Sequence, residues 1–180
     1  YDEDQRRSDL WIVASDGRVA PRRVTSGRAS EGDPVFSEDS TRIAFTAKRE
    51  EDDDAQVYVL NLGGGEAQRV TNWPGGAKSP RFSPDGGSIL FVGLTYPGAV
   101  TEEDNRKVAA DRKARKYNVR AYDSFPIRHW DRWLDELRPT LVVQPLDDAA
   151  PAHDLLAGTT LRSDPGYGGR LGNEGESLEA

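Results

Sequence analysis

Apolar and polar residues alternate through two matching stretches of the chain. Ile43 and Phe45 are two positions apart after a polar turn, and Ile89 and Phe91 repeat this spacing. Period-two alternation of β-branched and aromatic residues predicts β-strands rather than helices. A short polar segment precedes each of these strands, and apolar residues lie before it. Both stretches therefore predict tight antiparallel hairpins.

The two hairpins belong to a longer internal repeat. The segment Phe36–Phe45 matches Phe82–Phe91, 46 positions later. At the same offset, Arg23–Thr25 matches Arg69–Thr71. A unit of this length with four short antiparallel strands is typical of a β-propeller blade, which buries its apolar faces against neighbouring blades. The alternative is an ordinary β-sandwich with coincidental similarity, and the shared register of several separate segments argues against it.

The turns of the two copies differ in strength. Pro84-Asp85-Gly86-Gly87 combines a fixed φ, a side chain that bonds its own backbone and two residues that accept positive φ. The first copy has Glu38 and Ser40 in place of Pro and Gly, which predicts a weaker turn.

A further match, between Trp11–Val13 and Tyr58–Leu60 at 47 positions, allows the whole chain to be divided into blades. The fold class expected is all-β, a partial β-propeller of about two to three four-stranded antiparallel blades with a helical insertion inside one blade. The expected parts are the last two strands of one blade at 9–25, a complete blade at 34–71, the first two strands of a third at 79–94, and its remaining strands at 140–144 and 153–156. In terms of domains, residues 1–180 form the partial propeller, 95–138 the helical insertion and 157–180 a Gly-rich approach to a further blade.

The insertion begins with a predicted helix. Thr101-Glu102-Glu103-Asp104 has the form of a capping box, and acidic residues precede basic ones, which suits the helix dipole. We therefore expect a mostly solvated helix from Glu102 to Lys116. A basic helix that binds nucleic acid or a partner is the alternative, but the neighbouring acids cancel much of its field.

A second amphipathic segment follows at 128–137. Trp130, Trp133, Leu134 and Leu137 are spaced at i, i+3, i+4 and i+7, which predicts one apolar helical face. We expect this helix to seal the insertion onto the blades, with Pro139 ending it and returning the chain to a strand.

Composition narrows the classes of function. The 180 residues carry a net charge of −7, which argues against binding a phosphate backbone, so no nucleic-acid partner is expected. With Cys 0, disulfides, thiol nucleophiles and Cys-based zinc sites are excluded. This slightly favours a cytoplasmic location, although exported proteins also lack Cys and the periplasm stays open. No apolar run reaches the ~18 residues that span a bilayer, so no membrane partner is expected.

The ends of the chain suggest a piece of a longer protein. Met 0 means that no initiator is present, and Glu176–Ala180 stops inside an expected approach strand. The oligomeric state is left open.

Candidate ligand sites all have simpler structural explanations. Asp52-Asp53-Asp54 lacks the alternation and the Gly of a calcium loop, so a solvated hairpin tip is expected. Gly63-Gly64-Gly65 does not open a helix, which predicts a turn and no phosphate cradle. His129 is close to Asp131, but no nucleophile accompanies it, so we expect a structural role, and His153 lies at a predicted strand. The sequence therefore predicts no catalytic, cofactor-binding or metal-binding residue.

Two motifs resemble a known family. The Phe-Ser-Pro-Asp-Gly hairpin at Phe82–Gly86 resembles blades of the periplasmic Tol-system propeller and of prolyl oligopeptidase-family serine peptidases. The run Tyr122–Trp133, followed by Arg138 and the strand Leu141–Val143, resembles the Arg-His-Trp-Asp-x-Trp segment of the acylaminoacyl-peptidase and dipeptidyl-peptidase branch. Together the resemblance covers roughly residues 8–158.

The resemblance implies an N-terminal propeller joined to a C-terminal α/β-hydrolase domain with a Ser-Asp-His triad. Such hydrolases place the nucleophile in Gly-x-Ser-x-Gly, whereas the nearest segment here, Gly175–Glu179, lacks the second Gly. In some dipeptidyl peptidases an acidic pair holds the substrate amine, but Glu102 and Glu103 lack the aromatic context of that motif and suit a helix cap.

The expected function is that of a non-catalytic propeller segment, which gates and orients peptide substrates for a hydrolase domain outside this chain. The expected partners are that domain and the peptides, and the chain alone is expected to hydrolyse nothing. The alternative is a free-standing, Tol-system-like propeller that binds proteins in the cell envelope. A propeller sensor fused to a signalling domain is compatible with the hairpins but has no positive support.

Overall fold

The complete repeat unit folds as a four-stranded antiparallel sheet in the computed structural model, which describes residues 7–26, 29–117, 119, 128–129, 132–133, 137–147 and 150–161. Strands β3 (Glu31–Phe36), β4 (Arg42–Ala47), β5 (Gln56–Asn61) and β6 (Gln68–Arg69) are ordered β3-β4-β5-β6. The register sets Phe45 opposite Tyr58, and their stacked ring centroids are 6.0 Å apart.

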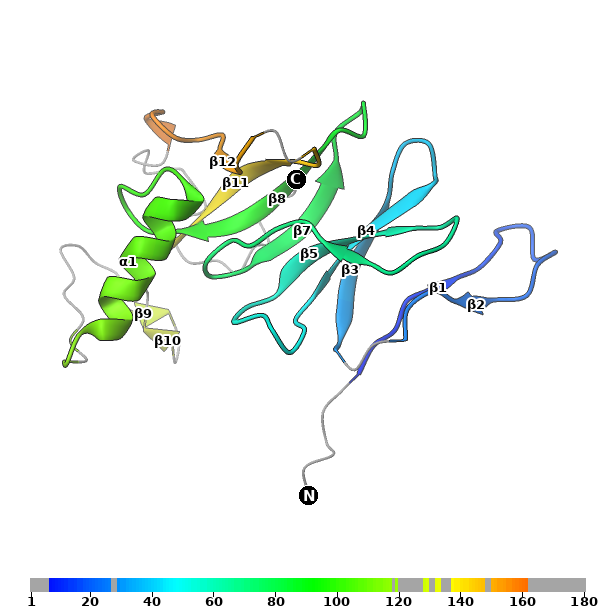
Figure 1. Ribbon diagram of the computed structural model, residues 1–180, viewed down its shortest axis with the longest axis horizontal. Helices are drawn as coiled ribbons and strands as arrows, with labels where there is room; N and C mark the ends of the chain where they lie inside the picture. Colours follow the sequence, from blue (N-terminus) through cyan, green and yellow to red (C-terminus); the bar gives the residue numbers. More distant parts are fainter. Residues whose placement is uncertain are drawn as a thin grey trace, which may run out of the picture.

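The next unit forms a second sheet of the same kind. Strands β7 (Ala77–Phe82), β8 (Ser88–Thr95), β11 (Arg138–Pro145) and β12 (His153–Asp154) are ordered β7-β8-β11-β12. Helix α1 (Glu102–Ala114) lies between β8 and β11 in the sequence, at one end of the molecule (Figure 1). The all-β propeller class with a helical insertion in one blade is thus confirmed.

A pair of strands precedes these two sheets. Strands β1 (Trp11–Ile12) and β2 (Arg22–Arg23) pair antiparallel with Trp11 opposite Arg23. Tyr58 and Arg69 hold the same relation in β5 and β6. The pair β1–β2 therefore corresponds to the last two strands of a blade. It lies at the end of the molecule opposite to α1 (Figure 1).

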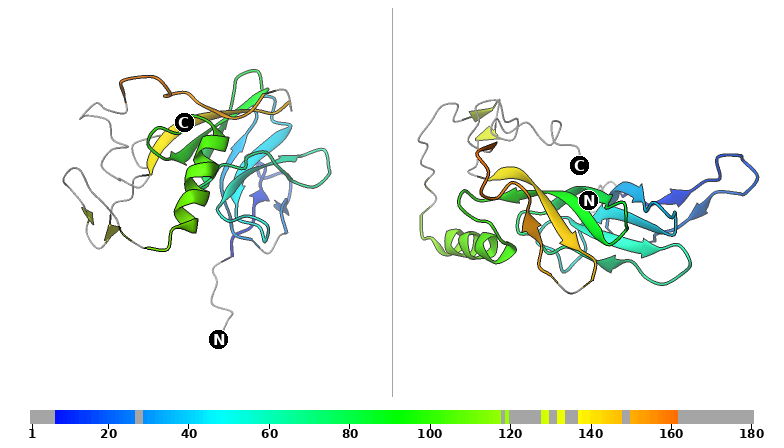
Figure 2. Two further views of the ribbon diagram at one scale, coloured as in Figure 1. Left: turned by 60° about the vertical axis from the view of Figure 1, so that its left-hand side comes forward. Right: turned by 90° about the horizontal axis from the view of Figure 1, so that it is seen from above.

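Two apolar clusters join the blades face to face. One packs Ile43, Phe45 and Tyr58 against Leu10 and Ile12 of the β1 segment. The other sets Ala44, Val57 and Trp73 of the central blade against the third, which contributes Ile89, Phe91 and Val142. Successive residues of β4 belong alternately to the two clusters. The period-two pattern of the sequence therefore places apolar side chains on both faces of this sheet. The layered blades are seen from above in Figure 2.

The predicted capping box opens α1. The Thr101 hydroxyl accepts from the Asp104 amide, and the Asp104 carboxylate accepts from the Thr101 amide. The helix ends at Ala114, two residues before the predicted Lys116. Although the helix is polar, Asn105 is fully buried and its Oδ1 accepts from the Tyr96 amide, which fixes α1 to the end of β8.

The prediction of a second helix at 128–137 is wrong. Residues Arg128–His129 form strand β9 and Arg132–Trp133 form β10, and the two strands pair antiparallel. A short apolar run fits both helical and extended periods, so four residues at helical spacing did not decide between them. The insertion limits at 95 and 138 and the approach segment 157–180 stay predictions, and residues 162–180 lie outside the described part of the chain.

Among the helices that the structure describes, none is long and apolar enough to cross a membrane.

Candidate functional site

Strands β3 and β7 are edge strands of adjacent sheets and carry the same irregularity. The pairing of β3 with β4 shifts register between Gly32 and Val35, and that of β7 with β8 shifts between Lys78 and Arg81. These positions are equivalent in the repeat, so the bulge is part of the blade design.

An X-Pro dipeptide occupies each bulge. Asp33 precedes Pro34 with φ 50°, and Ser79 precedes Pro80 with φ 49°, a left-handed conformation that is uncommon for residues other than Gly, Asn, Asp and His. The Ser79 amide donates to the Asp33 carboxylate at 3.3 Å, so the two bulges are bonded to each other across the blade interface.

The bulges change what this edge offers to another molecule. Proline lacks an N–H, and a bulge interrupts the row of unpaired backbone groups that would accept an added strand. The exposed side chains on the two strands include Asp33, Phe36, Lys78 and Arg81. This edge therefore presents charged and aromatic side chains rather than a template for β-strand addition.

The hairpin turns beyond these strands are rigid and alike. Ser37 donates to Asp39 at 2.6 Å, and Ser83 donates to Asp85 at 2.5 Å. Hydrogen bonds from Ser37 and from the Thr41 amide and hydroxyl lower the pKa of Asp39 to about 2. Bonds from Ser83 and the Gly87 amide likewise lower the pKa of Asp85. Both carboxylates are committed to turn structure.

Arg42 ties the two turns together. Its Nη2 donates to the Gly86 carbonyl at 2.8 Å, and its guanidinium lies 5.1 Å from the centroid of the Phe82 ring. Hydrogen bond and cation–π contact hold the hairpin of one blade against the first strand of the next.

Trp73 forms the second tie between these blades. It is almost completely buried, its indole Nε1 donates to the Leu94 carbonyl at 2.9 Å, and its ring meets Phe91 edge-on. The Gln56 side chain accepts from the Trp73 amide and donates to the Trp73 carbonyl. The blade interface, and with it the β3–β7 edge, is therefore held by polar as well as apolar contacts.

The prediction that the acidic run at Asp52 is solvated is wrong for Asp52 itself. The acidic run was expected to be solvated, but the Asp52 side chain is fully buried and accepts from Tyr58 Oη at 2.6 Å and Arg69 Nη1 at 2.7 Å. Burial opposes its ionisation, but these bonds and one from the Arg49 amide outweigh burial and lower the pKa of Asp52. Burial and the bond to Asp52 raise the pKa of Tyr58 to about 12. Because Arg49 stacks over Tyr58, the four residues form one network at the β4–β5 hairpin.

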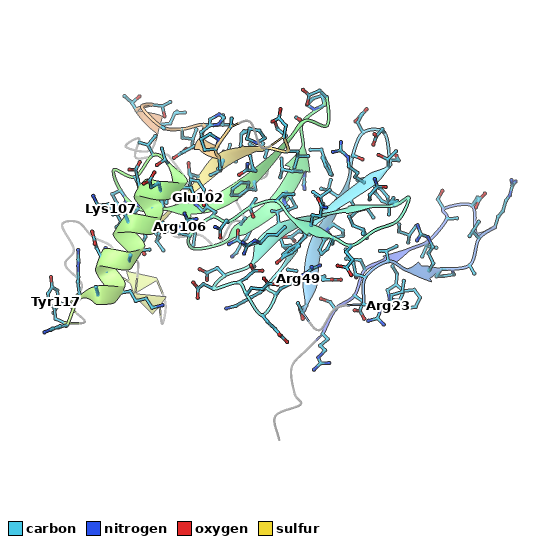
Figure 3. All side chains as sticks on the ribbon, viewed as in Figure 1. Arg23, Arg49, Glu102, Arg106, Lys107 and Tyr117 are labelled. Carbon is cyan, nitrogen blue, oxygen red and sulfur yellow. The ribbon has the colours of Figure 1, made fainter. Side chains whose placement is uncertain are left out.

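The acidic residue Glu102 has a structural partner. Glu102 forms an ion pair with Arg106 on the side of α1 that faces the sheets, whereas Lys107 points away from them (Figure 3).

The Gly-rich segment forms the predicted turn: the Gly64 amide donates to the Asn61 carbonyl, and Gly64 and Gly65 have positive φ, as a tight turn requires.

The two histidines lie on different strands. His153 is exposed on β12, whereas His129 belongs to β9, where only the backbone is described. Gly175–Glu179 falls outside the described residues. Within the described part of the chain, no group of three or more His, Asp or Glu residues is placed to hold a metal ion.

Two curated relatives are peptidases. The chain is 39% identical over 111 residues to the uncharacterized peptidase YuxL of Bacillus subtilis, covering 61% of the chain and 16% of that protein. It is 26% identical over 161 residues to dipeptidyl-peptidase 5 of Porphyromonas endodontalis, covering 87% of the chain and 21% of that protein. The chain thus spans only about a fifth or less of the length of these relatives. No protein-family profile matches it.

Solved structures share the fold. The AtxE2 isopeptidase aligns with a TM-score of 0.54 at 16% identity, over 86% of this chain and 25% of that one. The acylaminoacyl peptidase of Pyrococcus horikoshii aligns at 0.50 and 18% identity, over 80% of this chain and 20% of that one. A TolB from Agrobacterium tumefaciens aligns at 0.50 and 19% identity, over 81% of this chain and 40% of that one.

The solved structures show the fold of the chain, and the curated relatives show that its sequence is related to that of peptidases. The blades, the helical insertion and the related peptidases agree with the resemblance found in the hairpin motifs. The chain is a β-propeller segment related in sequence to proteins named as peptidases, in agreement with the resemblance to the prolyl oligopeptidase family noted in its motifs.

Proposed function

We propose that the chain is a non-catalytic propeller segment that gates and orients peptide substrates for an α/β-hydrolase domain of the same polypeptide. The observation that carries the proposal is the 39% identity over 111 residues to a protein named as a peptidase. The proposed organisation is a partial propeller over 1–180, an insertion at 95–138 and an approach to a further blade at 157–180.

The β3–β7 edge is the proposed gate. Propeller blades surround a central channel, and we place at that channel the edge strands β3 and β7, which lie next to each other in the two adjacent blades. The two strands are in contact, and the Ser79 amide donates to the Asp33 carboxylate between them. A peptide that passes this edge meets Lys78 and Arg81 as side chains, and it is not captured as an added strand. Passage then depends on peptide width and charge.

The experiment uses the intact polypeptide and compares a short chromogenic substrate with a longer, acidic one. The double variant Lys78→Ala/Arg81→Ala removes the exposed cations, and Lys107→Ala on the outer side of α1 is the matched control. We expect the ratio of kcat/KM for the long and short substrates to change severalfold in the double variant alone. Labelling by a fluorophosphonate should be equal in all three proteins, because it reports the nucleophile directly.

Each part of the proposal has its own point of failure. If the intact wild-type polypeptide neither reacts with a fluorophosphonate nor hydrolyses peptides, the peptidase assignment is wrong. If it does both but the substrate ratio is unchanged, the gating role is wrong.

The alternative is a free-standing propeller that binds proteins in the cell envelope. The likeness to TolB at 19% identity concerns the fold alone and does not favour that function. An intact polypeptide without fluorophosphonate reactivity that retains envelope proteins would support it instead.

A further inference from the structure

The bulge of β7 gathers two cations on one face of the third sheet. Lys78 is opposite Val92 on β8, and Arg81 is opposite Leu90. Opposite residues of an antiparallel pair share a face, and Val92 and Leu90 are two positions apart, so both cations lie on the same face. Without the extra residue of the bulge, residues three apart would point to opposite faces. The two cations are therefore neighbours, separated along the strand by the rise of two residues, about 7 Å.

The two cations are exposed and open to an anionic partner. Arg81 donates from Nη1 to the Pro80 carbonyl at 3.0 Å, which leaves the other donors of its guanidinium available. Among the residues that the structure describes, no acidic side chain forms an ion pair with either cation. The acid at the neighbouring bulge, Asp33, already accepts from the Ser79 amide.

The blade fold does not require these charges. The bulge of β3 shifts the register between Gly32 and Val35 in the same way. In the 46-residue repeat these two residues hold the positions of Lys78 and Arg81, and neither of them is charged. Val35 packs against the apolar cluster between the blades. The same bulge therefore forms with uncharged residues, and the cations of β7 indicate a role outside folding.

The edge that carries the two cations favours recognition through side chains. The X-Pro bulges of β3 and β7 interrupt the row of backbone groups that an added strand would need. A peptide at this edge is therefore held by what its side chains offer to Lys78 and Arg81. Carboxylates are the side chains in a peptide that match two exposed cations.

We propose that Lys78 and Arg81 bind two carboxylates of an extended peptide whose acidic side chains are at positions i and i+2. In an extended chain such side chains point the same way and are about 7 Å apart, which matches the spacing of the two cations. The Arg81 guanidinium can hold a carboxylate with two parallel N–H donors, and Lys78 supplies a compact charge. The inference names the substrate class of the proposed gate and rests on that proposed function.

The test measures peptide binding by the intact polypeptide after incubation with a fluorophosphonate, which blocks a serine nucleophile. Two fluorescent pentapeptides of equal charge and composition are compared by anisotropy, Gly-Glu-Gly-Glu-Gly and Gly-Glu-Glu-Gly-Gly. Because exposed ion pairs are weak, we expect the spaced peptide to bind about threefold to tenfold more tightly at low salt. The difference should vanish at high salt, where exposed charges are screened.

Variants assign the preference to the two cations. The double variant Lys78→Ala/Arg81→Ala should bind both peptides with the same, weaker affinity. Arg81→Lys keeps the charge and should keep most of the preference. Lys107→Ala, which removes a cation on the outer side of α1, is the matched control and should behave as the wild type.

The outcomes separate this inference from the proposed function. Equal affinity of the wild type for the two isomeric peptides would overturn the inference, and so would a preference that survives in the double variant. A polypeptide that shows the preference but neither reacts with a fluorophosphonate nor hydrolyses peptides would support the binding site and refute the peptidase assignment. A polypeptide that hydrolyses peptides but lacks the preference would overturn the inference alone.

Discussion

Gly93 is the position at which one added methyl group should damage the blade interface most directly. An added Cβ would lie 2.7 Å from Nε1 and 2.9 Å from Cδ1 of Trp73, far inside van der Waals contact. Trp73 has no free space to move into, because its side chain is 1% exposed and packs against Phe91. Gly93→Ala must therefore shift the indole and disturb its hydrogen bond to the Leu94 carbonyl.

The size of the effect follows from these contacts. Overpacking a core costs about 1–3 kcal/mol, and the indole hydrogen bond contributes about 0.5–1.5 kcal/mol. Replacing Gly by Ala in a strand returns about 0.5–1 kcal/mol through the unfolded state. The net loss in the free energy of unfolding should lie within about 0.5–4 kcal/mol, centred near 2 kcal/mol. For a chain of this size, a loss of about 2 kcal/mol is a fall in Tm of about 4–8 °C.

Thermal and urea unfolding followed by tryptophan fluorescence and near-ultraviolet circular dichroism measure this loss. Gly87→Ala is the matched control, because its Cβ meets only ordinary contacts from 3.5 Å and its φ is not positive, so we expect no loss and a gain of at most about 1 kcal/mol. In the Trp73→Phe background, Gly93→Ala should cost much less, because the crowded indole atoms are gone. A Gly93→Ala protein as stable as the wild type, or equal costs in both backgrounds, would refute the reasoning.

Three further predictions concern single sites. Ser40→Gly should stabilise the protein by about 0.5–1 kcal/mol in urea unfolding, because Ser40 has φ 56° and its equivalent in the next blade is Gly, whereas Ser40→Ala should bring no gain. Asp52→Asn should cost about 1–3 kcal/mol at neutral pH. Since the pKa of Asp52 is lowered on folding, the wild type should lose this contribution as pH falls below about 4, and the variant's stability should be flatter there. Thr101→Ala should cost about 1 kcal/mol and speed hydrogen exchange in α1, while Glu103→Ala should not.

Features set by neighbours in sequence were predictable. The strands of the two hairpins, the turn at Asp85 and the capping box at Thr101 each depend on residues within a few positions. The weakness of the first turn was also predictable, since Ser40 occupies a position where the second copy has Gly.

Features set by distant residues were not predictable from local pattern. Asp52 belongs to a polar run, and only the arrival of Tyr58 and Arg69 on adjacent strands makes it a buried acceptor. The helical spacing around Trp130 suggested a helix, whereas backbone pairing between β9 and β10 gives strands at Arg128–His129 and Arg132–Trp133. The one available signal for the missed bulges was the repeated X-Pro at 33–34 and 79–80.

The sequence by itself determined that this protein is built from propeller blades, because a 46-residue repeat with a period of two dictates which faces are apolar, and apolar faces must be buried. Tertiary structure alone decided which polar groups are buried and which edge is presented to other molecules. The contact of Trp73 with Gly93, the Asp33–Ser79 bond and the Asp52 network all join residues from different strands or blades. Their energies depend on distances that exist only once the blades have packed, and no local pattern in the chain encodes those distances.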